Sequence, residues 1–240
     1  MNLTNSPRPM REQIQRNYLS VLERIESAAS RSARPAGEIQ VIGVTKYVDS
    51  TVARWLVDCG CRKLAESRPQ MLWDKADALA DLQIDWHLIG HLQRNKAKRT
   101  LPLVSTVHSL DSSRLLLQIG QDAGDRVEPL KLLLEMNISG DPTKTGMMIA
   151  DGEALLEDWQ SRTNEFPNLK IVGLMGMGSL QGGPDKARQE FELLRNLRNR
   201  WSIRYGMPLA DLSMGMSDDF EVAIEEGATM VRIGSILFAD

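Results

Sequence analysis

The sequence predicts a closed (β/α)8 TIM barrel with one extra N-terminal helix, all in a single domain. Two observations carry this prediction. First, short apolar segments alternate strictly with helical segments. Such alternation indicates a parallel sheet, because each parallel neighbour needs a crossover connection, usually a helix. Second, the chain has 240 residues, and a barrel of this kind typically takes about 250 residues.

The first expected element is a long amphipathic helix over residues 7–34, in which Ile14, Val21 and Ile25 recur at helical spacing. The expected strands cover residues 41–46, 62–66, 84–89, 104–109, 130–138, 170–175, 211–214 and 229–233. The expected helices between them cover residues 50–58, 70–82, 95–100, 112–123, 151–165, 184–205 and 219–226. Asp111 is expected to be an N-cap.

We expect one domain over residues 1–240, with a leading helix at residues 1–36 and the barrel at residues 37–240. No linker or low-complexity tract suggests a second domain. An open doubly wound sheet is the alternative. It would normally carry a glycine-rich phosphate turn after its first strand, but Thr45, Lys46 and Tyr47 occupy that position.

The composition is that of an ordinary globular protein, with 42% hydrophobic and 25% charged residues. The net charge of -3 gives no general attraction to nucleic acid or anionic membranes. The basic run over residues 94–99 is therefore better interpreted as a solvated helix face than as a nucleic-acid site. The absence of a long apolar run and the two closely spaced cysteines, Cys59 and Cys61, predict a reduced, cytoplasmic protein without a membrane segment.

Lys46 is the first candidate for chemistry, because an apolar strand delivers its amine to one end of the sheet. A lysine that simply extends into water is the alternative interpretation. In a barrel the functional groups lie where strands end, and phosphates are commonly held after strands seven and eight. The residues at those two strand ends are Ser213, Gly215, Ser217, Arg232, Gly234 and Ser235. An amine that faces a phosphate site suggests pyridoxal 5'-phosphate (PLP), an aldehyde that lysine binds as a Schiff base.

The order of the motifs along nearly the whole chain resembles that of the PLP homeostasis proteins, single barrels similar to the N-terminal domain of alanine racemase. The motifs that carry the resemblance are residues 44–46, 86–96, 108–111 and 137–138, Lys144 and Gly146, and residues 173–175, 212–220 and 228–235. The chain departs from this family at Ser67 and Arg68, where the family has Asn-Tyr, and the effect of that change is left open.

The resemblance implies that Lys46 is the Schiff-base lysine and that Arg232 faces the pyridine nitrogen of PLP. It also implies that Ser213, Ser217, Gly234 and Ser235 surround the phosphate. Because arginine stays protonated, Arg232 would oppose protonation of the ring nitrogen and leave the ring a weak electron sink. Met214 and Met175 are further candidates for contact with the cofactor ring.

His87 has two interpretations: a polar role near the cofactor at the barrel mouth, or a histidine of the core. Its spacing of four residues from His91 would suit two metal ligands on a helix. The segment is a strand followed by Gly90, and no glutamate lies between the two histidines. We therefore predict no metal site.

Three functional hypotheses follow. The first, which the resemblance favours, is a monomeric, non-catalytic PLP carrier that manages the free cofactor level and serves PLP-dependent apo-enzymes. The second is a racemase-like enzyme that uses Lys46 alone as its base. Racemases with this barrel take a second base, a tyrosine, from an added domain, whereas the three tyrosines here are Tyr18, Tyr47 and Tyr205. The third is a binding module without a cofactor. The sequence does not indicate which proteins receive PLP or what triggers its release.

Overall fold

The computed structural model describes residues 7–141, 145–179 and 182–239. The strands are β1 (Gln40–Val44), β2 (Lys63–Glu66), β3 (Asp85–Leu88), β4 (Thr106–Leu110), β5 (Leu130–Met136), β6 (Leu169–Gly176), β7 (Asp211–Ser213) and β8 (Met230–Ile233). The helices are α1 (Pro7–Arg31), α2 (Ser50–Asp58), α3 (Pro69–Ala78), α4 (Arg94–Thr100), α5 (Ser113–Asp122), α6 (Ile149–Arg162), α7 (Gly183–Tyr205) and α8 (Phe220–Glu225). Short 3-10 helices include Ala36–Glu38 and Ser235–Leu237.

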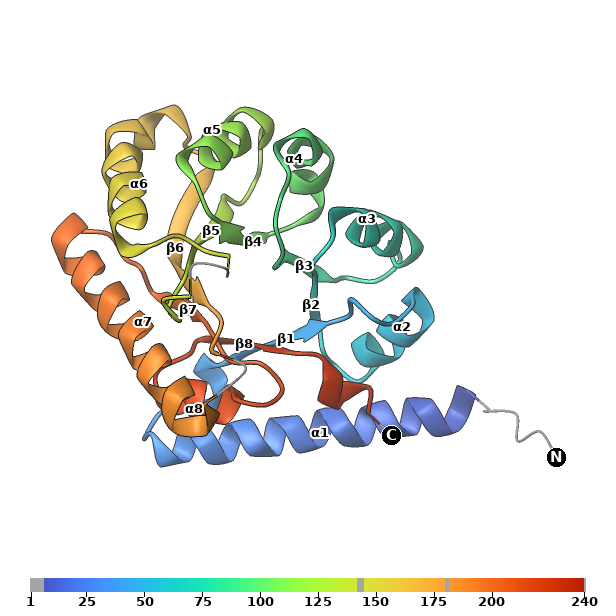
Figure 1. Ribbon diagram of the computed structural model, residues 1–240. Helices are drawn as coiled ribbons and strands as arrows, with labels where there is room; N and C mark the ends of the chain where they lie inside the picture. The colour runs from blue at the N-terminus through green and yellow to red at the C-terminus, as the bar shows by residue number, and fades with distance from the viewer. Residues whose placement is uncertain (1–6, 142–144, 180–181, 240) are drawn as a thin grey trace.

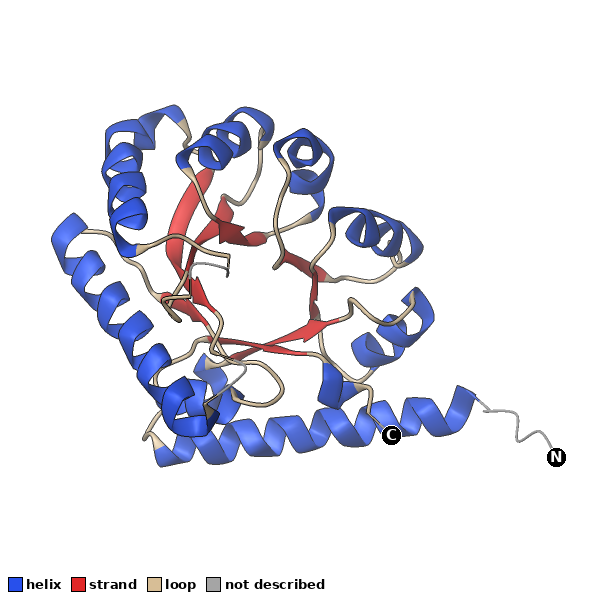
Figure 2. Cartoon of the chain, viewed as in Figure 1, coloured by secondary structure: helices blue, strands red, loops and turns tan. Residues whose placement is uncertain are grey.

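The strands form a closed parallel barrel in the order β1 to β8. Figures 1 and 2 show the strands as an inner ring with the helices outside it. β1 pairs with β2 on one side and with β8 on the other, where Ile42 lies opposite Arg232. The predicted (β/α)8 barrel is confirmed, and the open doubly wound sheet is wrong because such a sheet leaves its edge strands unpaired.

Apolar side chains form two separate clusters because side chains alternate between the two faces of each strand. The smaller cluster lies inside the barrel and consists of Ile42, Val44, Ala65 and Met230, with Ile89 packed against it. The larger cluster fills the layer between the strands and the surrounding helices. Alternate residues of β1 and β8 therefore face the interior.

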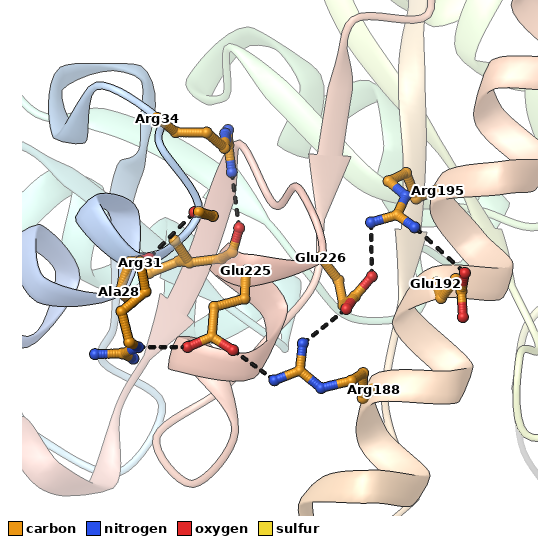
Figure 3. A network of polar contacts seen from close by, with 10 residues as sticks. Ala28, Arg31, Arg34, Arg188, Glu192, Arg195, Glu225 and Glu226 are labelled. Atoms are coloured by element: carbon orange, nitrogen blue, oxygen red, sulfur yellow. Dashed lines mark hydrogen bonds and ion pairs between the residues drawn. The ribbon is translucent and has the colours of Figure 1, made fainter.

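The leading helix α1 packs outside the barrel against α8, α2 and the C-terminal 3-10 helix, along the lower edge of Figure 1. Its apolar residues Ile14, Val21, Ile25 and Ala28 are buried, as their helical spacing predicts. An ion-pair network joins α1 and α7 to α8 at the surface (Figure 3). Its pairs are Arg31 with Glu225, Arg188 with Glu225 and Glu226, and Arg195 with Glu226.

Among the described helices, α2 and α5 start with a side-chain N-cap, and one of these caps corrects a prediction. Asp49 caps α2 by accepting a hydrogen bond from the Val52 amide at 2.9 Å, the usual N-cap geometry. The prediction that Asp111 is the N-cap of α5 is wrong. Ser112 is the N-cap of α5, and its hydroxyl accepts from the Leu115 amide at 3.3 Å. In the part of the chain that the structure describes, no helix combines the length and apolarity needed to cross a bilayer.

Candidate functional site

Lys46 lies in the turn that follows β1, at the carboxyl end of the barrel. Ile42 and Val44 face the interior, and Lys46 follows Val44 by two residues, at the end of the barrel where functional groups usually lie. Its side chain is exposed, and Nζ lies 4.9 Å from the centroid of the Tyr47 ring. The amine is thus accessible to a molecule that enters from solvent.

Arg232 lies on β8 with its guanidinium buried inside the barrel, and the residue is only 4% exposed. Nη1 donates to the carbonyl and the hydroxyl of Ser213 at 2.7 and 2.6 Å, and Nη2 donates to the Gly176 carbonyl at 3.0 Å. Burial lowers the pKa of Arg232 to about 10, while the negative charges of Asp219 and Glu135 oppose that shift. Arg232 therefore remains a cation at neutral pH, and the acceptors that bind it directly are neutral.

The loops after β7 and β8 meet beside this arginine. The amide of Gly234 donates to the hydroxyl of Ser217 at 3.2 Å, so the two loops are joined at the mouth. Ser217 is buried, whereas Ser235 is exposed at the start of its 3-10 helix. Gly215 has a φ of +89°, and a Cβ there would lie 2.6 Å from the Cβ of Ala223. A glycine is therefore required where α8 packs against this loop.

The helix expected to follow β7 starts later than the sequence suggests. α8 begins at Phe220, and Asp219 occupies the N-cap position without a capping bond to the first turn. Instead, Asp219 Oδ1 accepts from the Met216 amide at 2.6 Å. The Met216 amide at the start of this helix is thus already satisfied by a carboxylate.

Three of the predicted cofactor contacts are buried and already engaged by other groups of the protein. The Ser213 hydroxyl is fully buried and engaged by Arg232 and His108, with 2.8 Å between the hydroxyl and His108 Nδ1. Met214, next along the strand, points the other way into the core between barrel and helices. His87 is also inside the barrel, where its Nδ1 lies 2.8 Å from His108 Nε2. Its position resembles that of a core histidine more than a residue of the mouth.

A buried ion pair supports the turn that carries Lys46. On the outer face of the strands, Lys75 of α3 donates to Glu66 Oε1 and, at 2.6 Å, to the Thr45 carbonyl. The Thr45 hydroxyl donates to the same Glu66 oxygen at 2.6 Å. Within the described part of the chain, Glu66 Oε2 has no hydrogen-bond partner. The Glu66 and Lys75 side chains are 0% and 4% exposed, so the pair is held away from water directly behind the lysine turn.

Two carboxylates lie near the Arg232 cation without pairing with it. Burial raises the pKa of Glu135 on β5 and of Asp219, and the charge of Arg232 works in the opposite direction on both. Glu135 accepts a hydrogen bond from the Thr145 hydroxyl at 2.6 Å, which also favours its ionised form. The interior of the mouth is therefore polar on the side of β5 and β7.

An open pocket adjoins the mouth between the ends of β2 and β3. It is lined by Ser67, Arg68, Pro69, Gln70, Met71, His91, Gln93 and Lys96. Gly90 brings the two loops together, because a Cβ there would lie 2.1 Å from the Ser67 carbonyl oxygen. The two residues that depart from the resembled family, Ser67 and Arg68, thus form one wall of this pocket. His91 is exposed and lies 3.1 Å from Asp111 Oδ2, in surroundings unlike those of His87.

The sequence did not single out His108, Asp85, Glu66 or Lys75 as parts of this region. One signal was available for Lys75, which lies between Leu72 and Leu79 on the apolar stripe of its helix, where a charge needs a buried partner. The Lys144 motif position lies outside the described residues.

Comparison with known proteins gives consistent matches over the barrel. The chain matches the family described as "Alanine racemase, N-terminal domain" over residues 21–240. It is 40% identical to a pyridoxal phosphate homeostasis protein of Aquifex aeolicus, covering 92% of this chain and 95% of that protein. It is 31% identical to the pyridoxal phosphate homeostasis protein of Escherichia coli K12, covering 94% and 95% of the two chains.

Solved structures are similar over the same length. PipY of Synechococcus elongatus, solved with PLP bound, superimposes with a TM-score of 0.82 at 30% identity and covers 95% of this chain and 100% of that one. An alanine racemase of Clostridium difficile superimposes with a TM-score of 0.72 at 15% identity. That match covers 95% of this chain but 57% of the racemase, and at this identity it establishes the shared barrel fold only.

Proposed function

Because this chain belongs to the family of pyridoxal phosphate homeostasis proteins, built on the alanine racemase N-terminal domain, we propose that it binds PLP covalently through Lys46 and carries the cofactor without catalysing a reaction on it. The proposal includes PLP-dependent apo-enzymes as recipients, a monomeric state and a cytoplasmic location.

The observation that carries the proposal is the placement of two nitrogen groups at one end of the barrel. Lys46 presents an exposed amine at the mouth, and Arg232, on the adjacent strand, holds a buried cation below it. The hydroxyl of Ser217 and the backbone of Gly234 and Ser235 lie beside them, where the loops after β7 and β8 join.

These residues fit PLP by their chemistry. The Lys46 amine can add to an aldehyde, forming a C=N bond with release of water. Hydroxyls and backbone amides at the ends of strands seven and eight suit a phosphate. When bound, the cofactor supplies the aldehyde and an aromatic ring that can accept electrons. Placed beside the ring nitrogen, as the family resemblance implies, Arg232 would limit that capacity, because a cation there opposes protonation of the nitrogen.

The carrier role, as opposed to an enzymatic one, is supported by the positions of the tyrosines. A racemase needs a second base on the opposite side of the bound substrate. Tyr18 is buried in α1 and Tyr205 ends α7, both outside the barrel. Tyr47 is 88% exposed and adjoins Lys46 in the same turn. Tyr47 is therefore the residue that a racemase-like alternative would have to use.

An absorbance spectrum of the protein with added PLP tests the proposal. We expect a band at about 420 nm, a property of lysine-bound PLP, and its loss in Lys46→Ala. Lys96→Ala is the matched control, because Lys96 lines the neighbouring pocket and its loss should leave the band intact. A colourless wild type, or a band that survives in Lys46→Ala, would refute covalent binding at Lys46.

The non-catalytic part of the proposal has its own test. Purified, PLP-loaded protein is incubated with a panel of L-amino acids, and the formation of D-enantiomers is followed by chiral chromatography. We expect no turnover above background. A rate of even ~1 per second, at the low end of ordinary enzymes, would overturn the carrier role and leave PLP binding untouched. Loss of such a rate in Tyr47→Phe would then assign the second base.

A further inference from the structure

A row of polar side chains crosses the barrel interior from the mouth to the opposite end. Arg232 Nη1 lies 2.6 Å from the Ser213 hydroxyl, which lies 2.8 Å from His108 Nδ1. His108 Nε2 lies 2.8 Å from His87 Nδ1. His87 Nε2 faces Asp85 Oδ2 at 3.6 Å, longer than a hydrogen bond, and this nitrogen has no hydrogen-bond partner among the described residues.

This row runs through the centre of the barrel and along its axis. His108 is on β4 and Ser213 is on β7, and these strands are not neighbours, so the bond between them spans the interior. Arg232 lies near the carboxyl end of its strand, whereas Asp85 is the first residue of β3. The row therefore joins the two ends of the barrel beside the apolar cluster of the interior.

The donors and acceptors in this row can run in only one favourable direction. Arginine has no acceptor, so Arg232 must donate to the Ser213 oxygen. The single Ser213 proton is then free to be donated to His108 Nδ1, which places the His108 proton on Nε2. That proton is donated to His87 Nδ1, which in turn places the His87 proton on Nε2, facing Asp85.

The far end enforces the same direction. Asp85 is an acceptor fixed by Lys63 Nζ at 2.6 Å and by the Ser105 hydroxyl. Lys63, Ser105 and the buried His87 hold the pKa of Asp85 well below its ordinary value, against the opposite effect of burial. If both histidines carried their protons on Nδ1 instead, a lone pair of His87 would face the Asp85 carboxylate. Burial lowers the pKa of both His87 and His108, so each ring is neutral at pH 7.

We propose that His108 and His87 are positioning residues, fixed as Nε2–H tautomers, that orient Ser213 and Arg232 and link them to Asp85 at the far end of the barrel. The link holds the guanidinium in one orientation under the place where the cofactor ring nitrogen would lie. In that last respect the inference rests on the proposed function. The tautomers and the link are properties of the protein without any cofactor.

Nitrogen-15 NMR of the cofactor-free protein tests the tautomers directly. The chain has only three histidines, so labelling histidine gives three imidazole spectra. His91→Gln identifies the exposed ring, and the two remaining rings are both expected to be neutral Nε2–H tautomers with slowly exchanging protons. An Nδ1–H tautomer or an imidazolium at either buried ring at pH 7 would overturn the inference, whether or not the protein binds PLP.

Two substitutions at His108 then separate positioning from simple packing. The Asn oxygen can occupy the place of Nδ1, so His108→Asn keeps an acceptor for Ser213. His108→Gln places its amide near Nε2 and leaves Ser213 without that acceptor. We expect His108→Gln to weaken PLP binding about tenfold, or about 1.4 kcal/mol, and to shift the absorbance of the bound cofactor, while His108→Asn retains most of both. His91→Gln is the matched control.

The test depends on the difference in PLP affinity and absorbance between His108→Asn and His108→Gln, and not on folding alone. Thermal melts establish whether both His108 variants are folded. Equal affinities and identical cofactor spectra in two folded variants would refute the positioning role. If either variant does not fold, Ser213→Ala replaces the pair, because it removes the bridge between Arg232 and His108 with little change in volume. An unchanged spectrum in Ser213→Ala would equally refute the role.

Discussion

Replacing Lys75 by methionine is the sharpest test of how the lysine turn is supported. Lys75 is nearly fully buried, and its ammonium donates to Glu66 and to the carbonyl of Thr45, the residue before Lys46. Methionine has a similar length and fills the same space. The substitution therefore removes a charge and two hydrogen bonds without opening a cavity.

The magnitude follows from the burial of the partner that remains. In Lys75→Met, Glu66 stays 0% exposed with one oxygen already lacking a partner, and only the Thr45 hydroxyl is left to bind its other oxygen. Breaking a buried pair in this way typically costs about 3–5 kcal/mol. An exposed pair would be worth only about 0–1 kcal/mol. We therefore expect a loss of about 3–5 kcal/mol in the free energy of unfolding.

Urea unfolding followed by fluorescence measures this loss. The slope of the free energy of unfolding against urea concentration should stay unchanged, as expected when both proteins unfold in two states. The double variant Glu66→Gln with Lys75→Met provides the control, because it removes both charges and keeps an acceptor for Thr45. It should recover at least about 2 kcal/mol relative to Lys75→Met, since a neutral buried pair carries a smaller desolvation penalty. A loss below about 1 kcal/mol in Lys75→Met, the value of a surface pair, would refute the reasoning.

Two further predictions concern charge. The pKa values of His87 and His108 in the folded protein lie below the ordinary 6.5. Below that pH the unfolded chain therefore binds more protons than the folded protein, and the free energy of unfolding decreases as the pH falls. Urea unfolding between about pH 7 and pH 5.5 should show the free energy of unfolding falling by up to about 1.4 kcal/mol per pH unit for each histidine. The slope should be about half as large in His108→Asn, which keeps only one buried histidine. A free energy of unfolding that does not change with pH would contradict the neutral burial of both rings. In the surface network, Glu225→Gln should lower the free energy of unfolding by only about 0.2–1 kcal/mol. Salt at about 1 M should reduce that difference, because it screens exposed charges. A loss above about 2 kcal/mol would show that the pair between Glu225 and Arg188 is not screened by solvent.

The sequence was sufficient to predict the architecture because strand and helix patterns alternate along the whole chain. Each strand is a short apolar run and each crossover a helix, so all eight units could be placed in order. Boundaries were less accurate, because helix and strand ends depend on contacts from elsewhere in the chain. The helix expected to reach residue 82 ends at Ala78, and the strand expected to reach residue 138 ends at Met136. The family resemblance stated from the motifs is confirmed by the comparisons.

The site was predictable to the level of strand ends but not of side-chain direction. Lys46, Arg232, Ser217 and Gly234 do lie at one end of the barrel. Their roles toward PLP stay predictions. β7 has only three residues and ends at Ser213, with Met214 directly after it. It is too short for a period of two to reveal which of these two side chains faces inward. Register and tilt bring the former, and not the latter, into contact with Arg232 and His108.

The polar row inside the barrel could not be predicted at all, because its members come into contact only once the barrel has closed. Most of its neighbours in sequence are apolar, and a polar row in that position costs free energy relative to a fully apolar interior. The polar row is explained by the charge of Arg232, because the row orients the guanidinium without neutralising it. A carboxylate bonded directly to Arg232 would neutralise the guanidinium, and with it the effect on the cofactor ring. Three neutral groups, Ser213, His108 and His87, instead separate Arg232 from the carboxylate of Asp85, which is paired with Lys63 at the far end of the barrel. The cation is thereby oriented while its charge remains unpaired at the mouth, as the proposed non-catalytic binding of PLP requires.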